Sequence, residues 1–150
     1  MLTGTKGMLI RKPPADVFRA FADPAVTTKF WYTRSSGPMT AGAKLRWDWE
    51  MFGASANVVV KEVEPERRIV FDWGFDGPMR TVELRFVPWT EHTYVNVVET
   101  GYRGTLEEMA AQAIDSISGF SLVLAAAKAW LEHGLQLAVV ADHIVPGLQL

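Results

Sequence analysis

Residues 44–51 read KLRWDWEM, and this stretch decides the fold class. Leu45, Trp47, Trp49 and Met51 alternate with charged residues along it. Alternation with a period of two is typical of a β-strand that has one buried face and one solvated face. The two tryptophans on the apolar side indicate that large aromatic rings line the buried face.

The same period of two extends from this stretch through the segment between Trp31 and Tyr102. After a turn at Gly53 we expect four further strands, over about residues 54–61, 68–73, 81–86 and 93–100. Consecutive strands joined by short turns predict an antiparallel meander. Together with a first strand over residues 5–11, the sheet is expected to have six to seven strands.

Helical patterns lie before and after these strands. Pro14 suits the first turn of a helix, where its missing N–H costs nothing, and Val17 and Phe21 lie on one apolar face of that helix. Asp23 is a good N-cap for a second short helix, predicted over residues 24–30.

A long helix is predicted towards the C-terminal end. Thr105 and Glu108 have the spacing of a capping box, and the long helix follows over about residues 115–133. Gly134 suits a left-handed C-terminal cap. The fold class is therefore α+β, with a curved antiparallel sheet around a long C-terminal helix and two short helices after the first strand. The expected apolar stripe of the long helix consists of Ile117, Phe120, Leu124, Ala127 and Leu131.

A length of 150 residues suits one domain, so residues 1–150 are taken as a single unit. Residues 135–150 are an apolar extension with three open placements. They could lengthen the helix, pack as a tail, or cover a second copy of the chain and give a homodimer.

Composition excludes several classes of function. There is no cysteine and the net charge is −2 without a basic patch, so neither a disulfide nor a nucleic-acid partner is expected. The sequence contains no uninterrupted run of 18 apolar residues, so it predicts no membrane span. The N-terminal residues lack a signal-peptide pattern, and we therefore expect a cytoplasmic protein. His92, His133 and His143 are scattered, and we expect no metal and no other cofactor.

Five segments resemble one known family: Pro13–Phe21 followed by Lys29-Phe30-Trp31, Gly42–Asp48, Val63–Trp73, Glu99–Tyr102 and Ala129–Gly134. They are similar to homologues of an activator of a heat-shock-chaperone ATPase, within the START-related superfamily, also called SRPBCC or polyketide-cyclase-like. The resemblance covers residues 5–134 and implies a helix-grip fold, as in the birch-pollen allergen. Relatives often carry a Gly-Trp pair near the long helix, where this chain has Gly119-Phe120.

Large rings on the inward side of the strands face the apolar stripe of the long helix. One interpretation is that they fill the core, since each large ring buries about 150–250 Å². The other, which the resemblance supports, is that sheet and helix leave an apolar pocket between them. The candidate ligand-binding residues are Trp31, Trp47, Trp49, Phe71, Trp73, Phe86, Glu99, Phe120 and Leu124.

Glu99 is the one candidate with a charge. Its position on the last strand matches the inward-facing Val95 and Val97, yet it lies at the strand end, where it could also point to solvent. Arg46 and Arg103 are its candidate partners. A buried carboxylate needs such a partner or a hydrogen bond, because burial disfavours its charge.

The leading functional hypothesis is the binding of a small hydrophobic molecule between sheet and helix. A cyclase-like or hydrolase-like enzyme that acts on an apolar substrate in the same pocket is the first alternative. The sequence identifies no catalytic residue for this enzyme. Enzymatic activity is therefore uncertain, and binding without catalysis is favoured. A module that interacts with a chaperone ATPase is the second alternative.

Overall fold

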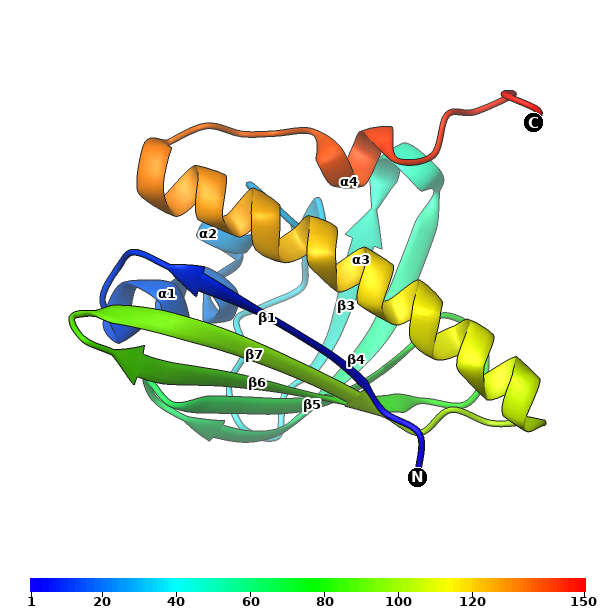
Figure 1. Cartoon of the computed structure of the whole chain (residues 1–150), viewed down its shortest axis with the longest axis horizontal. Coiled ribbons are helices and arrows are strands. Elements are labelled where there is room, and N and C mark those ends of the chain that lie inside the picture. Colours follow the sequence, from blue (N-terminus) through cyan, green and yellow to red (C-terminus); the bar gives the residue numbers. More distant parts are fainter.

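The computed structural model describes residues 1–150 and has the predicted helix-grip architecture (Figure 1). The seven strands form one antiparallel sheet in the order β1-β7-β6-β5-β4-β3-β2. The elements in chain order are β1 (Gly4–Ile10), α1 (Pro14–Ala22), α2 (Pro24–Thr27), β2 (Arg34–Ser35), β3 (Lys44–Trp49), the 3-10 turn η1 (Glu50–Phe52), β4 (Ala54–Glu64), β5 (Arg68–Gly74), β6 (Arg80–Trp89), β7 (His92–Thr100), α3 (Leu106–His133) and α4 (Val139–Asp142).

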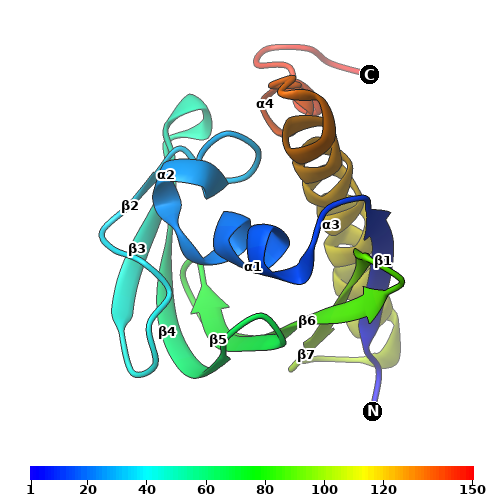
Figure 2. The same cartoon turned by 90° about the vertical axis from the view of Figure 1, so that its left-hand side faces the viewer.

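The sheet curls so that its concave side takes up α1 and faces α3 (Figure 2). Phe18 and Phe21 of α1 lie with their ring centroids 5.6 and 5.8 Å from that of Phe86 on β6. On the other side, α3 runs along β1. Because α1 fills one end of the concave side and α3 spans its length, the space between them and the β3–β4 hairpin determines where a cavity can form.

Helix α3 is longer than the sequence predicts, because it begins at Leu106 rather than near residue 115. The Thr105 hydroxyl accepts a hydrogen bond from the Glu108 N–H at 3.1 Å, as expected for the capping position. Gly134 ends the helix in the left-handed conformation (φ 66°). By length and composition α3 could cross a membrane, but in this fold it is the helix that packs against the sheet.

Two α3 side chains fasten the helix to the end of β1. Lys128 Nζ donates to the Leu9 carbonyl at 2.7 Å, and the Glu132 carboxylate accepts from the Arg11 N–H at 2.8 Å. Burial alone would raise the pKa of Glu132, but the hydrogen bonds from Arg11 and Lys128 hold it below its usual value. This junction fixes the position of the helix over the sheet.

Two local predictions were wrong. Strand β3 ends at Trp49 and the chain turns through η1, so Met51 is 39% exposed rather than on the inward face. The second short helix ends at Thr27 rather than Phe30. Thr27 donates its hydroxyl back to the Ala20 carbonyl at 2.5 Å, and the loop that follows turns Trp31 into the interior.

The core contains a stacked aromatic pair, Tyr32 on Trp47, with ring centroids 4.5 Å apart. Both side chains are fully buried. Burial disfavours the charged tyrosinate and raises the pKa of Tyr32 to about 12.

A loss of stability in alkali follows from this tyrosine. Above pH 10 the unfolded chain gives up the Tyr32 proton while the folded chain keeps it, so the unfolded state is favoured until about pH 12. Stability should fall by roughly 2–3 kcal/mol across this window. Urea unfolding between pH 9 and 12 should show a smaller fall for Tyr32→Phe, and parallel curves for the two proteins would contradict this.

Candidate functional site

A cavity of about 530 Å³ opens between α3, α4, the end of β3–β4 and the β5–β6 hairpin. Its volume falls within the roughly 300–1,000 Å³ of small-molecule pockets. The wall is formed by residues that lie far apart in the sequence. It consists of Trp31, Trp49, Phe52, Ala54, Trp73, Gly74, Phe75, Asp76, Gly77, Pro78, Arg80, Glu99, Asp115, Ser116, Gly119, Phe120, Leu122, Val123, Val140, His143 and Ile144.

Aromatic rings form a continuous side of this cavity. Trp73 is central, with ring centroids 5.8 Å from Trp31, 5.9 Å from Phe120 and 6.3 Å from Trp49. Phe75 extends the row towards the mouth, 5.7 Å from Trp73. Edge-to-face and tilted arrangements at these distances are favourable for aromatic rings, so the rings stabilise one another and make this side of the cavity apolar.

A buried carboxylate lies among these rings. Glu99 is 1% exposed, and its Oε2 accepts a hydrogen bond from the indole N–H of Trp73 at 2.7 Å. Its Oε1 forms an ion pair with Arg80, whose Nη1 lies 3.5 Å away. The inward placement of Glu99 is thus the one the structure adopts, and its carboxylate is held by Trp73 and Arg80.

Arg80 is the cation that faces Glu99, so the prediction of Arg46 or Arg103 as its partner was wrong. Val82 pairs with Glu99 across β6 and β7, which brings Arg80, two residues earlier on β6, to the same end of the sheet. Arg46 Nε instead donates to Asp48 Oδ1 at 3.0 Å.

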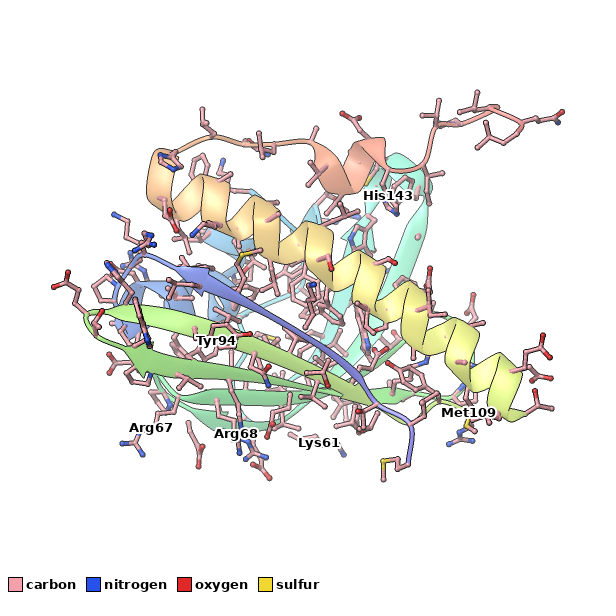
Figure 3. All side chains as sticks on the ribbon, in the orientation of Figure 1. Lys61, Arg67, Arg68, Tyr94, Met109 and His143 are labelled. Carbon is pink, nitrogen blue, oxygen red and sulfur yellow. The ribbon has the colours of Figure 1, made fainter.

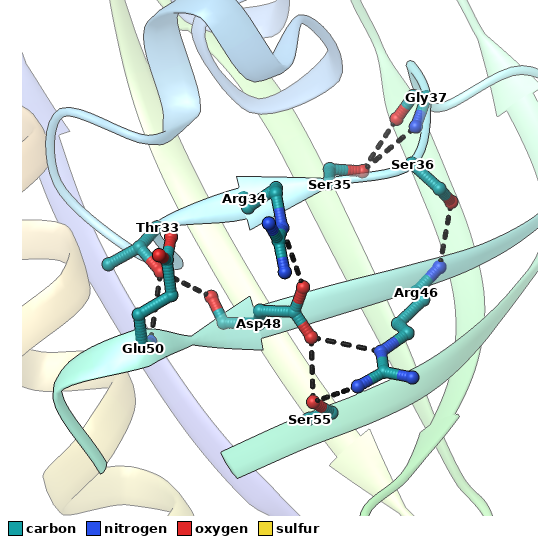
Figure 4. Close-up of polar contacts among 9 residues, drawn as sticks. All are labelled: Thr33, Arg34, Ser35, Ser36, Gly37, Arg46, Asp48, Glu50 and Ser55. Carbon is teal, nitrogen blue, oxygen red and sulfur yellow. Dashed lines mark hydrogen bonds and ion pairs between the residues drawn. The ribbon is translucent and has the colours of Figure 1, made fainter. Parts of the chain in front are cut away.

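A second polar cluster lies on the outer face of the sheet beside the short strand β2 (Figure 4). It is centred on Asp48. Asp48 accepts from Ser55 Oγ at 2.6 Å and from Arg34 Nε at 2.9 Å, in addition to Arg46. The hydrogen bond from Ser55, followed by those from Arg46 and Arg34, holds the pKa of Asp48 well below its usual value. Every carboxylate oxygen is partnered here, so the cluster joins β2 to β3 and β4.

The nine predicted ligand-binding residues fall into two groups. Trp31, Trp49, Trp73, Glu99 and Phe120 line the cavity. The others, Trp47, Phe71, Phe86 and Leu124, are buried in the core behind the wall. That the first group binds a ligand stays a prediction, and the second group supports the wall from behind.

Several wall residues were missed from the sequence. Gly119 lies in the middle of α3, where a glycine lowers helix stability, and a Cβ added to it would meet nothing within 4 Å. A glycine at an unfavourable position inside the helix was the feature of the sequence that could have indicated this part of the wall.

Val140, His143 and Ile144 come from the C-terminal extension, which packs back over the cavity. Figure 3 shows His143 beside α4. No group of three or more acidic or histidine side chains is placed to hold a metal ion.

Fold and cavity together define the class: a helix-grip protein with an aromatic cavity under its C-terminal helix. The chain belongs to the family described as Activator of Hsp90 ATPase homolog 1-like protein, which matches residues 11–131. A comparison with curated proteins gave no match by sequence.

Solved structures share this fold. SSP2350 from Staphylococcus saprophyticus is 25% identical, with a TM-score of 0.80 over 91% of this chain and 96% of that one. DynU16, from the dynemicin biosynthetic locus, is 25% identical with a TM-score of 0.79 over 89% of this chain, which spans 48% of DynU16. The Aha1 dimer from Colwellia psychrerythraea is 17% identical, with a TM-score of 0.76 over 89% and 98% of the two chains, and shows a shared fold.

Proposed function

We propose that this protein binds a small hydrophobic molecule in the cavity between α3 and the sheet. The observation that carries the proposal is the combination of an aromatic wall with one buried carboxylate, Glu99, which Trp73 and Arg80 hold in place. A few polar groups placed in an apolar pocket are what small-molecule sites typically use for orientation. The proposed location of the protein is the cytoplasm.

Binding is proposed in preference to catalysis. Acid–base chemistry on an apolar substrate needs a group free to exchange a proton with it. Glu99 is the one fully buried carboxylate of the wall, and it is held between Trp73 and Arg80. No specific observation favours the cyclase-like or hydrolase-like alternative, or the chaperone-ATPase module.

Native mass spectrometry and thermal unfolding test the proposal. Protein purified without detergent should carry a small molecule, or should bind apolar ring compounds from a panel of sterols, fatty acids and polycyclic aromatics. A ligand at 100 times its Kd adds about 2.7 kcal/mol, or roughly 5–10 °C in Tm. If no compound shifts Tm and nothing co-purifies, ligand binding is not the function.

A homodimer is proposed from residues 135–150, which leave Leu135, Leu137 and Leu148 exposed. The structural neighbour Aha1 is a dimer, which supports this proposal. Light scattering of the purified full-length chain should give twice the 16.7 kDa mass of one chain. A monomer mass at all concentrations would rule the dimer out.

A further inference from the structure

Residues 135–150 reverse direction after Gly134 and run back along α3, which brings α4 to the end of the β3–β4 hairpin (Figure 1). Gly134 has a φ of 66°, a conformation that glycine adopts at little cost. Helix α4 contacts α3, and the ring of His143, which follows α4, lies edge-on to Phe52 of η1 with the centroids 5.8 Å apart. The segment therefore bridges the gap between the long helix and η1, over the cavity.

Apolar contact alone holds this segment in place. After the helix cap, where the Leu135 N–H donates to the Ala129 carbonyl, no hydrogen bond or salt bridge joins residues 136–150 to the rest of the chain. Val139 and Val140 pack half-buried against the core, and the residues on either side of α4 are exposed. A segment with few buried contacts and no hydrogen bonds to its surroundings opens at a low cost in free energy.

The other sides of the cavity belong to elements that hydrogen bonds hold. Strands β4, β5 and β6 are paired within the sheet, and α3 is fastened to the end of β1 by Lys128 and Glu132. In contrast, Val140, His143 and Ile144 can leave the wall without breaking a hydrogen bond to any other element. The C-terminal segment is thus the side of the cavity that opens most easily.

We propose that residues 135–150 are a lid, which swings out about Gly134 to admit a small apolar molecule and closes over it through α4. This inference rests on the proposed function, since it concerns the same cavity. It adds a route of entry, and it makes lid opening the step that limits both binding and release, as lids do in many proteins.

Loosening the lid tests the inference in the full-length protein. Stopped-flow fluorescence with N-phenyl-1-naphthylamine, a neutral apolar dye that takes up energy from the tryptophans of the wall, measures both rate constants. Val140→Ser weakens the contact of α4 with the core, so association and dissociation should both become roughly threefold faster or more. Val145→Ser makes the same change at a lid side chain that is 54% exposed and should leave both rates unchanged.

A covalent closure tests the lid in the opposite direction. The chain has no cysteine, so Phe52→Cys with His143→Cys supplies the two thiols, which a short bis-maleimide joins. The joined protein should take up and release the dye about tenfold more slowly, or slower still, than the same variant with both thiols capped by N-ethylmaleimide. Because substitutions and adducts match in the two samples, the difference reports movement of the lid.

The outcomes separate the two proposals. If Val140 is only part of the wall, Val140→Ser speeds dissociation and leaves association unchanged, because lost contacts act mostly on release. That result, or equal rates in the joined and capped proteins, overturns the lid and leaves the cavity as a site with another entrance, such as one past Gly77 and Pro78. Failure of the dye and of the wider panel to bind overturns the proposed function as well.

Discussion

Trp47→Ala is expected to destabilise the fold by about 3–5 kcal/mol, the usual cost of removing a fully buried large ring. Trp47 has no exposed surface, stacks on Tyr32, and lies with its ring centroid 5.0 Å from Trp31 and 5.2 Å from Phe71. Domains are commonly stable by about 5–15 kcal/mol, so this one substitution removes a large part of the total. Urea unfolding followed by circular dichroism measures the loss as a lower midpoint.

Trp89→Ala is the matched control. Trp89 lies at the end of β6 with 54% of its surface exposed, so its removal should change stability by only about 0.5 kcal/mol. Because both variants lose the same side chain, a difference between their losses of stability reports the burial of the ring and not its chemical type. A loss below about 1 kcal/mol for Trp47→Ala would show that the aromatic cluster does not support the fold.

Gly119→Trp is expected to abolish ligand binding, with at least a hundredfold rise in Kd. The position lines the cavity and has open space around an added Cβ, so the indole can turn inwards onto the aromatic wall. Burying about 150–250 Å² there would stabilise the inward position by roughly 4–6 kcal/mol, and a ligand that must displace the ring would lose more than about a hundredfold in affinity. Titration with 4-phenylphenol, followed by calorimetry, gives the Kd.

Two other variants test this interpretation. Gly119→Ala should stabilise α3 by about 0.5–1 kcal/mol and keep binding, because a methyl group adds little bulk. Ala125→Trp, on the exposed side of the same helix, should leave the Kd unchanged. If Gly119→Trp binds the probe as well as the wild type does, the ligand does not occupy the space under α3.

The sequence predicted the sheet well because its signal is local. Alternation along residues 44–49 and 81–86 identified inward faces that the structure confirms. The parity of Glu99 agrees with its buried position, but its place at the strand end had left a solvent-facing position open. Alternation does not distinguish a core position from a cavity wall. Trp47 and Trp49 have the same parity, but Trp47 is enclosed by other rings, whereas Trp49 borders open space at the strand end.

The partner of Glu99 could not be predicted, because it depends on strand register. Arg80 comes close only because Val82 pairs with Glu99, and register is a property of two strands together. The contribution of Val140 and His143 to the wall depends on how the chain folds back after Gly134, for which residues 135–138 gave no turn signal. Long-range geometry, rather than residue type, accounts for most of what was missed.

Both margins of the sheet are closed to strand addition. At one margin β2 is only two residues long, and at the other the outward-facing Leu9 carbonyl and Arg11 N–H are taken by Lys128 and Glu132. Exposed strand edges are where foreign strands join and amyloid-like aggregates grow. We therefore expect copies of this protein to associate through helix or tail surfaces rather than through a shared sheet.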